Sequence, residues 1–296
     1  MSRCAANLLW AGVILHGATV RVGVIFALAT AFAASPLPAL AQDNAAVANS
    51  NGPGLLVSPT YVVLDGHTRS QALLLSNRGT TPETYRITIV NRLQKADGQL
   101  VETDKPAEGE GFASTIVRYA PREVVLPPDK PQTVRLLLQM PANLPDGEYR
   151  SHILFQQIPT VKPSEDVANN VAPGISVTIR AVFGVTIPLI VRKGNLSATA
   201  SVSDLHLVHL ADEQPAVALH LNRAGTRSLH GDLIAAVDGS PVGQLKNVNV
   251  FLSAPYRELV IPLSAKGDLK GHRVSVQFTE DDTLPGAASA SQTLSP

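Results

Sequence analysis

The clearest alternation of apolar and polar positions lies in residues 174–194, GISVTIRAVFGVTIPLIVRKG. Every odd position from Ile175 to Ile187 is apolar, and the even positions are polar up to Arg180. A period of two places successive side chains on opposite faces of an extended strand. The pattern therefore predicts a strand of roughly 40 Å at ~3.3 Å per residue, about twice the common length.

The second half of this stretch differs from the first. After Arg180 the even positions become apolar or small, with Val182 and Gly184, so the two halves should have different surroundings. Pro188 has no N–H, and pairing on that side of the strand should stop or switch there. We interpret the stretch as the last strand of one β-domain running directly into the first strand of another. A plain buried core strand remains the alternative.

Shorter strand patterns recur on both sides of this stretch, and no long segment has a helical period. Their spacing of about 8–12 residues, with turn residues between them, is typical of β-sandwiches. Pro59 falls inside the first pattern and predicts an edge strand or a change of sheet. The predicted strands are 55–64, 70–76, 84–93, 99–103, 116–120, 123–126, 133–139 and 147–158, then 196–210, 216–221, 231–237, 248–251, 259–263 and 273–278. Turns are predicted at 95–98, 238–239 and 266–267, and loops at 104–111 and 159–173.

The N-terminus carries the features of an export signal. Residues 22–34 form an apolar run that is short for a membrane span of ~20 residues, and Ala39-Leu40-Ala41 supplies a small–x–small cleavage pattern. Residues 1–41 are therefore predicted to be a signal peptide and 42–53 a flexible lead-in. An uncleaved anchor and a later translation start are the alternatives. Cys4, the single cysteine, lies in this leader, so the mature sandwiches should be held together by core packing without a disulfide. We expect the mature chain not to be embedded in a membrane.

Composition and motifs argue against several classes of function. Lys and Arg together number 24, equal to Asp and Glu, so no basic excess predicts a nucleic-acid partner. His206 and His209 would face opposite sides of a strand and do not form a metal-ligand pattern. No nucleophile elbow, phosphate loop or dinucleotide fingerprint is present. We expect no enzyme activity, no metal and no cofactor.

Three motifs in the first half then carry a family resemblance. The first runs from Ser58-Pro59-Thr60 through Leu64-Asp65-Gly66 to 74–77. The second, PREVVLPP at 121–128, leads into QTVR at 132–135, and the third, LPDGEYR at 144–150, leads into FQQIP at 155–159. In this order and spacing they resemble the PapD-like periplasmic chaperones of pilus assembly, over about residues 54–193.

The resemblance implies an all-β chain with two immunoglobulin-like sandwiches in a boomerang arrangement, 54–193 and 194–280. Residues 281–296 are mostly polar and small, and this composition predicts a disordered tail. It implies a periplasmic protein that lends an edge strand to pilin-like subunits lacking a strand and delivers them to an outer-membrane usher. Carried over by position, the donor residues are Ile175, Val177, Ile179 and Ala181. An interdomain ion-pair network is implied for Glu148, Arg192 and Asp268.

One departure from the family concerns its two basic residues that bind the subunit's C-terminal carboxylate. At those positions this chain has Tyr61 and Pro188, and neither can neutralise a carboxylate. Arg180, Arg192 and Lys193 are the candidate substitutes, with an ordinary solvated charge as the alternative for each. A second hypothesis for the whole chain is an immunoglobulin-like surface or adhesion protein that binds carbohydrate or protein through its loops.

Overall fold

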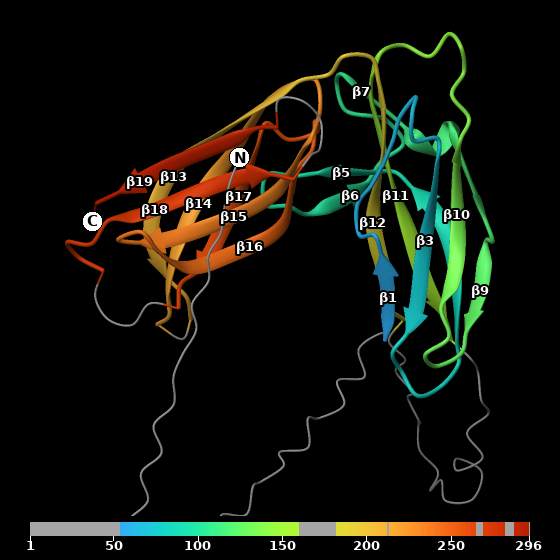
Figure 1. The fold of residues 1–296 in the computed structure, drawn as a ribbon, viewed down its shortest axis with the longest axis horizontal. Helices are drawn as coiled ribbons and strands as arrows, with labels where there is room; N and C mark the ends of the chain where they lie inside the picture. The colour runs from blue at the N-terminus through green and yellow to red at the C-terminus, as the bar shows by residue number, and fades with distance from the viewer. Residues whose placement is uncertain (1–53, 160–181, 212, 265–268, 282–286, 296) are drawn as a thin grey trace, which may run out of the picture. The chain divides into compact units, whose positions relative to one another are not determined.

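The computed structural model describes residues 54–159, 182–211, 213–264, 269–281 and 287–295 (Figure 1). Within these ranges the chain is almost entirely β-strand, with one short 3₁₀ turn at Ala113–Thr115 and no α-helix. The described strands form two β-sandwiches, each of two packed sheets around its own core. The expected all-β, immunoglobulin-like class is confirmed. None of the described helical segments is long and apolar enough to cross a membrane.

The first sandwich packs a four-stranded sheet on a larger one. The smaller sheet has the order β1-β3-β10-β8 and the larger β2-β12-β11-β4-β9, with β7 also paired to β11. Side chains alternate between core and solvent along β10, which matches the period of two in its sequence. The bounds are β1 Leu55–Ser58, β2 Val62–Leu64, β3 Ser70–Asn77, β4 Glu83–Val90, β7 Glu110–Gly111, β8 Val117–Ala120, β9 Glu123–Leu126, β10 Gln132–Leu138, β11 Gly147–Ile158 and β12 Gly184–Lys193.

The second sandwich pairs a sheet of order β13-β14-β17 with one of order β16-β15-β18-β19. A separate hairpin, β5 Arg92–Gln94 with β6 Leu100–Glu102, follows β4. The bounds are β13 Ala198–His209, β14 Pro215–Gly225, β15 Leu229–Val237, β16 Ser240–Val250, β17 Tyr256–Pro262, β18 Val274–Glu280 and β19 Ser289–Leu294.

Several local predictions are confirmed. The segment containing Pro59 changes sheets, because β1 pairs with β3 in one sheet and β2 pairs with β12 in the other. Gly98 has a φ of 86° in the β5–β6 turn, and Asp238 and Gly239 have φ values of 47° and 83° in the β15–β16 turn. These left-handed angles are the ones that Asp-Gly hairpin turns require.

Three predictions are wrong or only partly right. The tail is not wholly without structure, since β19 pairs along β18 from Ser289 to Leu294; alternation of small residues gave too weak a signal. The 104–111 loop contains β7, where Glu110 is buried. The central strand does not run into the second sandwich: β12 ends at Lys193, and Gly194, with a φ of 83°, turns the chain before β13.

The predicted signal peptide, the lead-in, most of the 159–173 loop and the 266–267 turn lie outside the described residues.

Candidate functional site: the outer edge of strand β12

Strand β12 is covered completely on one side and only partly on the other. Its ladder with β11 runs without a register shift from the Gly147–Lys193 pair to the Gln156–Gly184 pair. On the opposite side β2 pairs only with Leu189, Ile190 and Val191. From Gly184 to Pro188 that side has no partner strand among the described residues. We call these five residues the open edge.

The backbone directions at the open edge follow from one hydrogen bond. The Gln157 N–H donates to the Phe183 carbonyl over 2.9 Å, so the odd residues of β12 direct their backbone polar groups toward β11. Gly184, Thr186 and Pro188 therefore direct theirs outward. The N–H that proline lacks at position 188 is one that would point away from β11. Pro188 therefore pairs opposite His152 without interrupting the β11 ladder.

The position of Pro188 thus confirms the predicted switch in pairing, because β2 begins to cover β12 at the next residue. Before that point the open edge offers outward N–H groups at Gly184 and Thr186 and an outward carbonyl at each even residue. An additional strand needs such groups in order to pair with a sheet.

Apolar side chains adjoin the open edge. Val182 is 49% exposed and Phe183 is 37% exposed, immediately before the first residue of β12. Ile187 is buried in the core of the first sandwich, so β12 is anchored on one face. Arg92 donates from Nη1 to the Thr186 hydroxyl over 3.2 Å, which places a cation beside the open edge.

The donor residues expected from the sequence, Ile175, Val177, Ile179 and Ala181, lie outside the described residues, as does Arg180. Their assignment stays a prediction. The structure describes the strand into which they lead, and that strand carries the open edge.

The predicted contact between Glu148 and Arg192 is present. Arg192 Nε lies 3.1 Å from Glu148 Oε2, and both side chains are buried. The two residues are cross-strand partners on β11 and β12, so the pair itself belongs to the first sandwich. The backbone N–H of Ser228, which directly precedes β15 of the second sandwich, donates to Glu148 over 3.1 Å, and the Ser228 hydroxyl donates to Glu148 as well. Asp268 lies outside the described residues.

The described candidates for binding a carboxylate are already engaged. Arg192 pairs with buried Glu148 and is 6% exposed. Lys193 Nζ lies 3.4 Å from Asp146 Oδ1 and donates to the Leu144 carbonyl. Tyr61, at the family's first basic position, stacks on His230 with ring centroids 3.8 Å apart and planes 7° apart. Arg192 is buried, and Lys193 is partly exposed but holds an ion pair and a hydrogen bond, so neither cation is a simple solvated charge.

A buried ion pair that the sequence did not predict lies on the same face of β11. Arg150 Nε and Nη2 donate to the two carboxylate oxygens of Glu110 over 2.6 and 2.8 Å, and each side chain is 1% exposed. Burial raises the pKa of Glu110, and the charge of Arg150 opposes that rise. Glu110 stands in an acidic, glycine-containing segment, so composition alone predicted solvent exposure.

Other buried polar groups surround this pair. Burial, together with the charges of Arg150 and Arg92, lowers the pKa of His152 to about 3, so its ring is neutral. Gln94 of the hairpin donates from its N–H to the Ser253 hydroxyl and from its side chain to the Asn249 carbonyl, and its Oε1 accepts the Phe251 N–H. Gln94 therefore joins the hairpin to the second sandwich. No group of His, Asp, Glu or Cys in the described ranges is arranged to hold a metal ion.

No protein-family model matches the chain, and no curated protein matches it significantly. Among solved structures, the chain is similar to the YadV chaperone, at 14% identity and a TM-score of 0.42, over 81% of this chain and 100% of that one. It is similar to the Pseudomonas aeruginosa CupB2 chaperone, at 16% identity and a TM-score of 0.40, over 81% and 100%. A third similar structure, at 13% identity and a TM-score of 0.43 over 80% and 97%, comes from the CsuC–CsuE chaperone–tip adhesion subunit pre-assembly complex of Acinetobacter baumannii. The two-sandwich architecture itself follows from the strand pairing of this chain.

Proposed function

We propose that this protein is a periplasmic chaperone that binds exported pilus or fimbrial subunits lacking a strand, by pairing its β12 edge with them, and that it delivers them to an outer-membrane usher. The open edge carries the proposal, because Gly184 and Thr186 direct their N–H and carbonyl groups outward and the side of β12 opposite β11 has no partner strand there among the described residues. The motifs at 121–135 and 144–159 support it as a resemblance.

The physical basis is β-augmentation. A subunit that lacks a strand has unpaired main-chain groups and an uncovered apolar groove, and an edge strand with alternating apolar side chains satisfies both. Each Ile or Val side chain that leaves water contributes roughly 1.5–3 kcal/mol. Three such residues, Ile175, Val177 and Ile179, together with main-chain bonds, could then dominate affinity, although ordering the preceding segment offsets part of the gain.

The buried pair of Glu148 and Arg192 has a positioning role in this proposal. Arg192 lies on β12, the strand that carries the open edge, and its partner Glu148 on β11 accepts a hydrogen bond from Ser228 of the second sandwich. The pair therefore ties the second sandwich to β11 and β12. Asp268 is the proposed third member of the network.

A proline scan of outward-facing edge positions tests the proposal. Thr186→Pro removes an outward N–H from the open edge but leaves the β11 ladder intact, as Pro188 already does. Val125→Pro is the matched control: the Ile87 N–H donates to the Arg122 carbonyl over 2.8 Å, so Val125 on β9 also directs its N–H outward, at the opposite edge of the same sheet.

The assay uses the mature chain and a pilin-like subunit encoded near its gene. We expect Thr186→Pro to weaken the isolated complex in size-exclusion chromatography and to reduce the suppression of subunit aggregation. Val125→Pro should behave like the parent. Equal capture by both variants would place the capture surface elsewhere, and binding of glycans without any subunit would favour the adhesion hypothesis.

A second pair of changes tests the predicted donor residues. Val177→Asp with Ile179→Asp should abolish subunit capture and leave the far-ultraviolet circular dichroism unchanged, because an edge that faces solvent tolerates charge. If the double variant unfolds the first sandwich, these residues belong to its core. If it stays folded and still protects subunits, they are not donors.

A further inference from the structure

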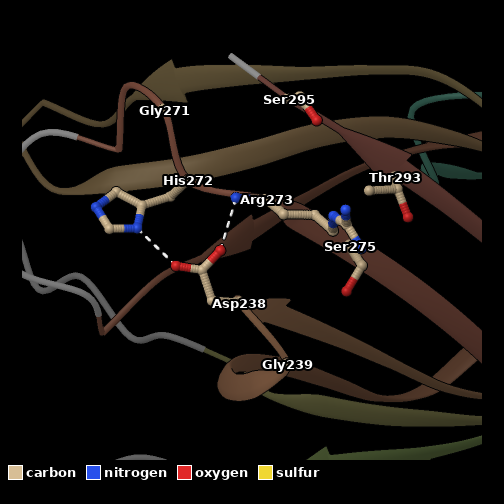
Figure 2. A pocket seen from close by; sticks show the side chains of 8 residues that line it. All are labelled: Asp238, Gly239, Gly271, His272, Arg273, Ser275, Thr293 and Ser295. Carbon is tan, nitrogen blue, oxygen red and sulfur yellow. Dashed lines mark hydrogen bonds and ion pairs between the residues drawn. The ribbon is translucent and has the colours of Figure 1, made fainter.

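A polar hollow of about 770 Å³ lies at one end of the second sandwich (Figure 2). It is formed where the β15–β16 turn, the segment before β18 and the end of β19 meet. Gly239 and Gly271 line it, and a methyl group added at either would meet no atom within 4 Å. The volume falls within the range of ~300–1,000 Å³ that is usual for small-molecule sites.

The acidic wall of the hollow is fixed and its carboxylate is satisfied. Asp238 Oδ1 accepts the Arg273 backbone N–H over 2.8 Å, and Oδ2 lies 2.7 Å from His272 Nδ1. The Asp238 N–H in turn donates to the Arg273 carbonyl over 2.8 Å. The hydrogen bond from His272, followed by that from the Arg273 backbone, lowers the pKa of Asp238. These bonds hold the segment before β18 against the turn.

The Arg273 side chain is not used in this arrangement. Its guanidinium makes no hydrogen bond or ion pair within the described ranges, and Figure 2 shows it extending along the sheet toward Ser275 and Thr293. Ser275 and Thr293 are cross-strand partners on β18 and β19. Their hydroxyls, with that of Ser295, have no internal partner in the part of the chain that the structure describes.

The hollow therefore presents unused donors around the Arg273 cation, and the one carboxylate among its described lining residues, that of Asp238, is already bonded. A planar guanidinium matches the oxygens of a carboxylate or phosphate in a two-pronged contact, and hydroxyls add further donors. We propose that this hollow binds an oxyanion group, a carboxylate or a phosphate ester, carried by a larger solute, with Arg273 as the principal contact. This site is separate from the open edge of β12 and does not depend on the proposed chaperone function.

A titration followed by nuclear magnetic resonance tests the proposal. The mature chain is titrated with sodium phosphate and, separately, with sodium acetate, both at constant ionic strength. We expect saturable amide shifts at Arg273, Ser275 and Thr293. Saturation by phosphate alone would identify phosphate esters as the ligand class, and saturation by acetate alone would identify carboxylates. Unsaturable shifts with both ions would overturn the site.

Four variants distinguish a specific binding site from general attraction of anions by positive charge. Arg273→Gln should weaken binding by roughly tenfold or more, as expected for loss of a charged hydrogen bond, and Thr293→Ala should weaken it less. Arg135→Gln is the matched control, because it removes one exposed arginine from an outer sheet face of the first sandwich. If Arg135→Gln weakens binding as much as Arg273→Gln, or if Arg273→Lys with Thr293→Ala binds like the parent, the proposal is wrong.

Discussion

Replacing Arg150 with Met should destabilise the first sandwich more than most single substitutions. The change removes a two-pronged contact with Glu110 in which both side chains are 1% exposed. It also removes the 2.7 Å bond from Nη1 to the Arg92 carbonyl and the guanidinium's position 4.4 Å from the centre of the Phe251 ring. Methionine fills part of the space but leaves the Glu110 carboxylate buried without its cation.

The magnitude follows from that unpaired carboxylate. Removing one partner of a buried ion pair costs about 3–5 kcal/mol, whereas replacing both partners by apolar groups is often close to neutral. We therefore expect Arg150→Met to lose about 3–5 kcal/mol, and Glu110→Leu in the Arg150→Met background to recover most of the loss. The double variant should then lose much less unfolding free energy than the two single variants lose in sum, and this non-additivity is the signature of a direct interaction between Arg150 and Glu110.

The pH dependence gives a second, independent readout. Burial raises the pKa of Glu110 in the folded chain, and Arg150 opposes that rise. For an acid with a raised folded pKa, the contribution to stability is full below the unfolded pKa and is lost as pH rises through the folded value. Without Arg150 to oppose the effect of burial, the folded pKa of Glu110 rises further, and stability keeps falling up to a higher pH. The loss of unfolding free energy in Arg150→Met should therefore be larger at pH 7 than at pH 5.

The assay is urea unfolding of the mature chain followed by circular dichroism at both pH values. Each sandwich has its own core, so two transitions should be fitted where they separate. A loss below about 1 kcal/mol at pH 7 would refute the reasoning, because it would lie within the range of an exposed pair. An equal loss at pH 5 and pH 7 would refute the assignment of the cost to an ionised Glu110.

Three further outcomes are expected. N-terminal sequencing of exported protein should begin at Gln42, and an intact leader would contradict the predicted cleavage. Gln94→Ala should lower the free energy of unfolding by about 1–3 kcal/mol, because it leaves the buried Phe251 N–H without an acceptor; stability equal to the parent in urea would contradict this. Gly225→Ala should lower the melting temperature more than Gly239→Ala, since both have positive φ but a Cβ at Gly225 would lie 2.3 Å from the Ser197 carbonyl oxygen; equal shifts would count against a steric cause.

The period-two pattern predicted most of the fold. Strand β11 was predicted with its observed bounds, and the sheet change at Pro59 was predicted from the missing N–H. Both rest on local rules, alternation and proline chemistry, that a single sequence contains. Strand β19 was missed because its small residues, mostly Ser and Ala, give little hydrophobic contrast.

The candidate site was less predictable because it depends on long-range pairing. That Glu148 and Arg192 meet followed from a motif resemblance, but the partner of Arg150 is forty residues away in a segment that looked solvent-exposed. The open edge could not be located from the sequence, since the limit of β2 along β12 is a property of the sheet. Pro188 marks the residue at which the pairing of β12 changes, but the sequence does not show which of the two sides of the strand is affected.

Pro188 has a consequence for how the protein behaves at high concentration. An unpaired strand edge is a template on which copies of the same chain can associate. Because Pro188 offers no N–H, the open edge presents only two outward donors, at Gly184 and Thr186, before β2 covers the strand. Two identical molecules could form few mutual main-chain bonds there. Pro188→Ala should therefore leave the fold intact and make the chain more prone to self-association, so one residue limits aggregation while the edge stays open.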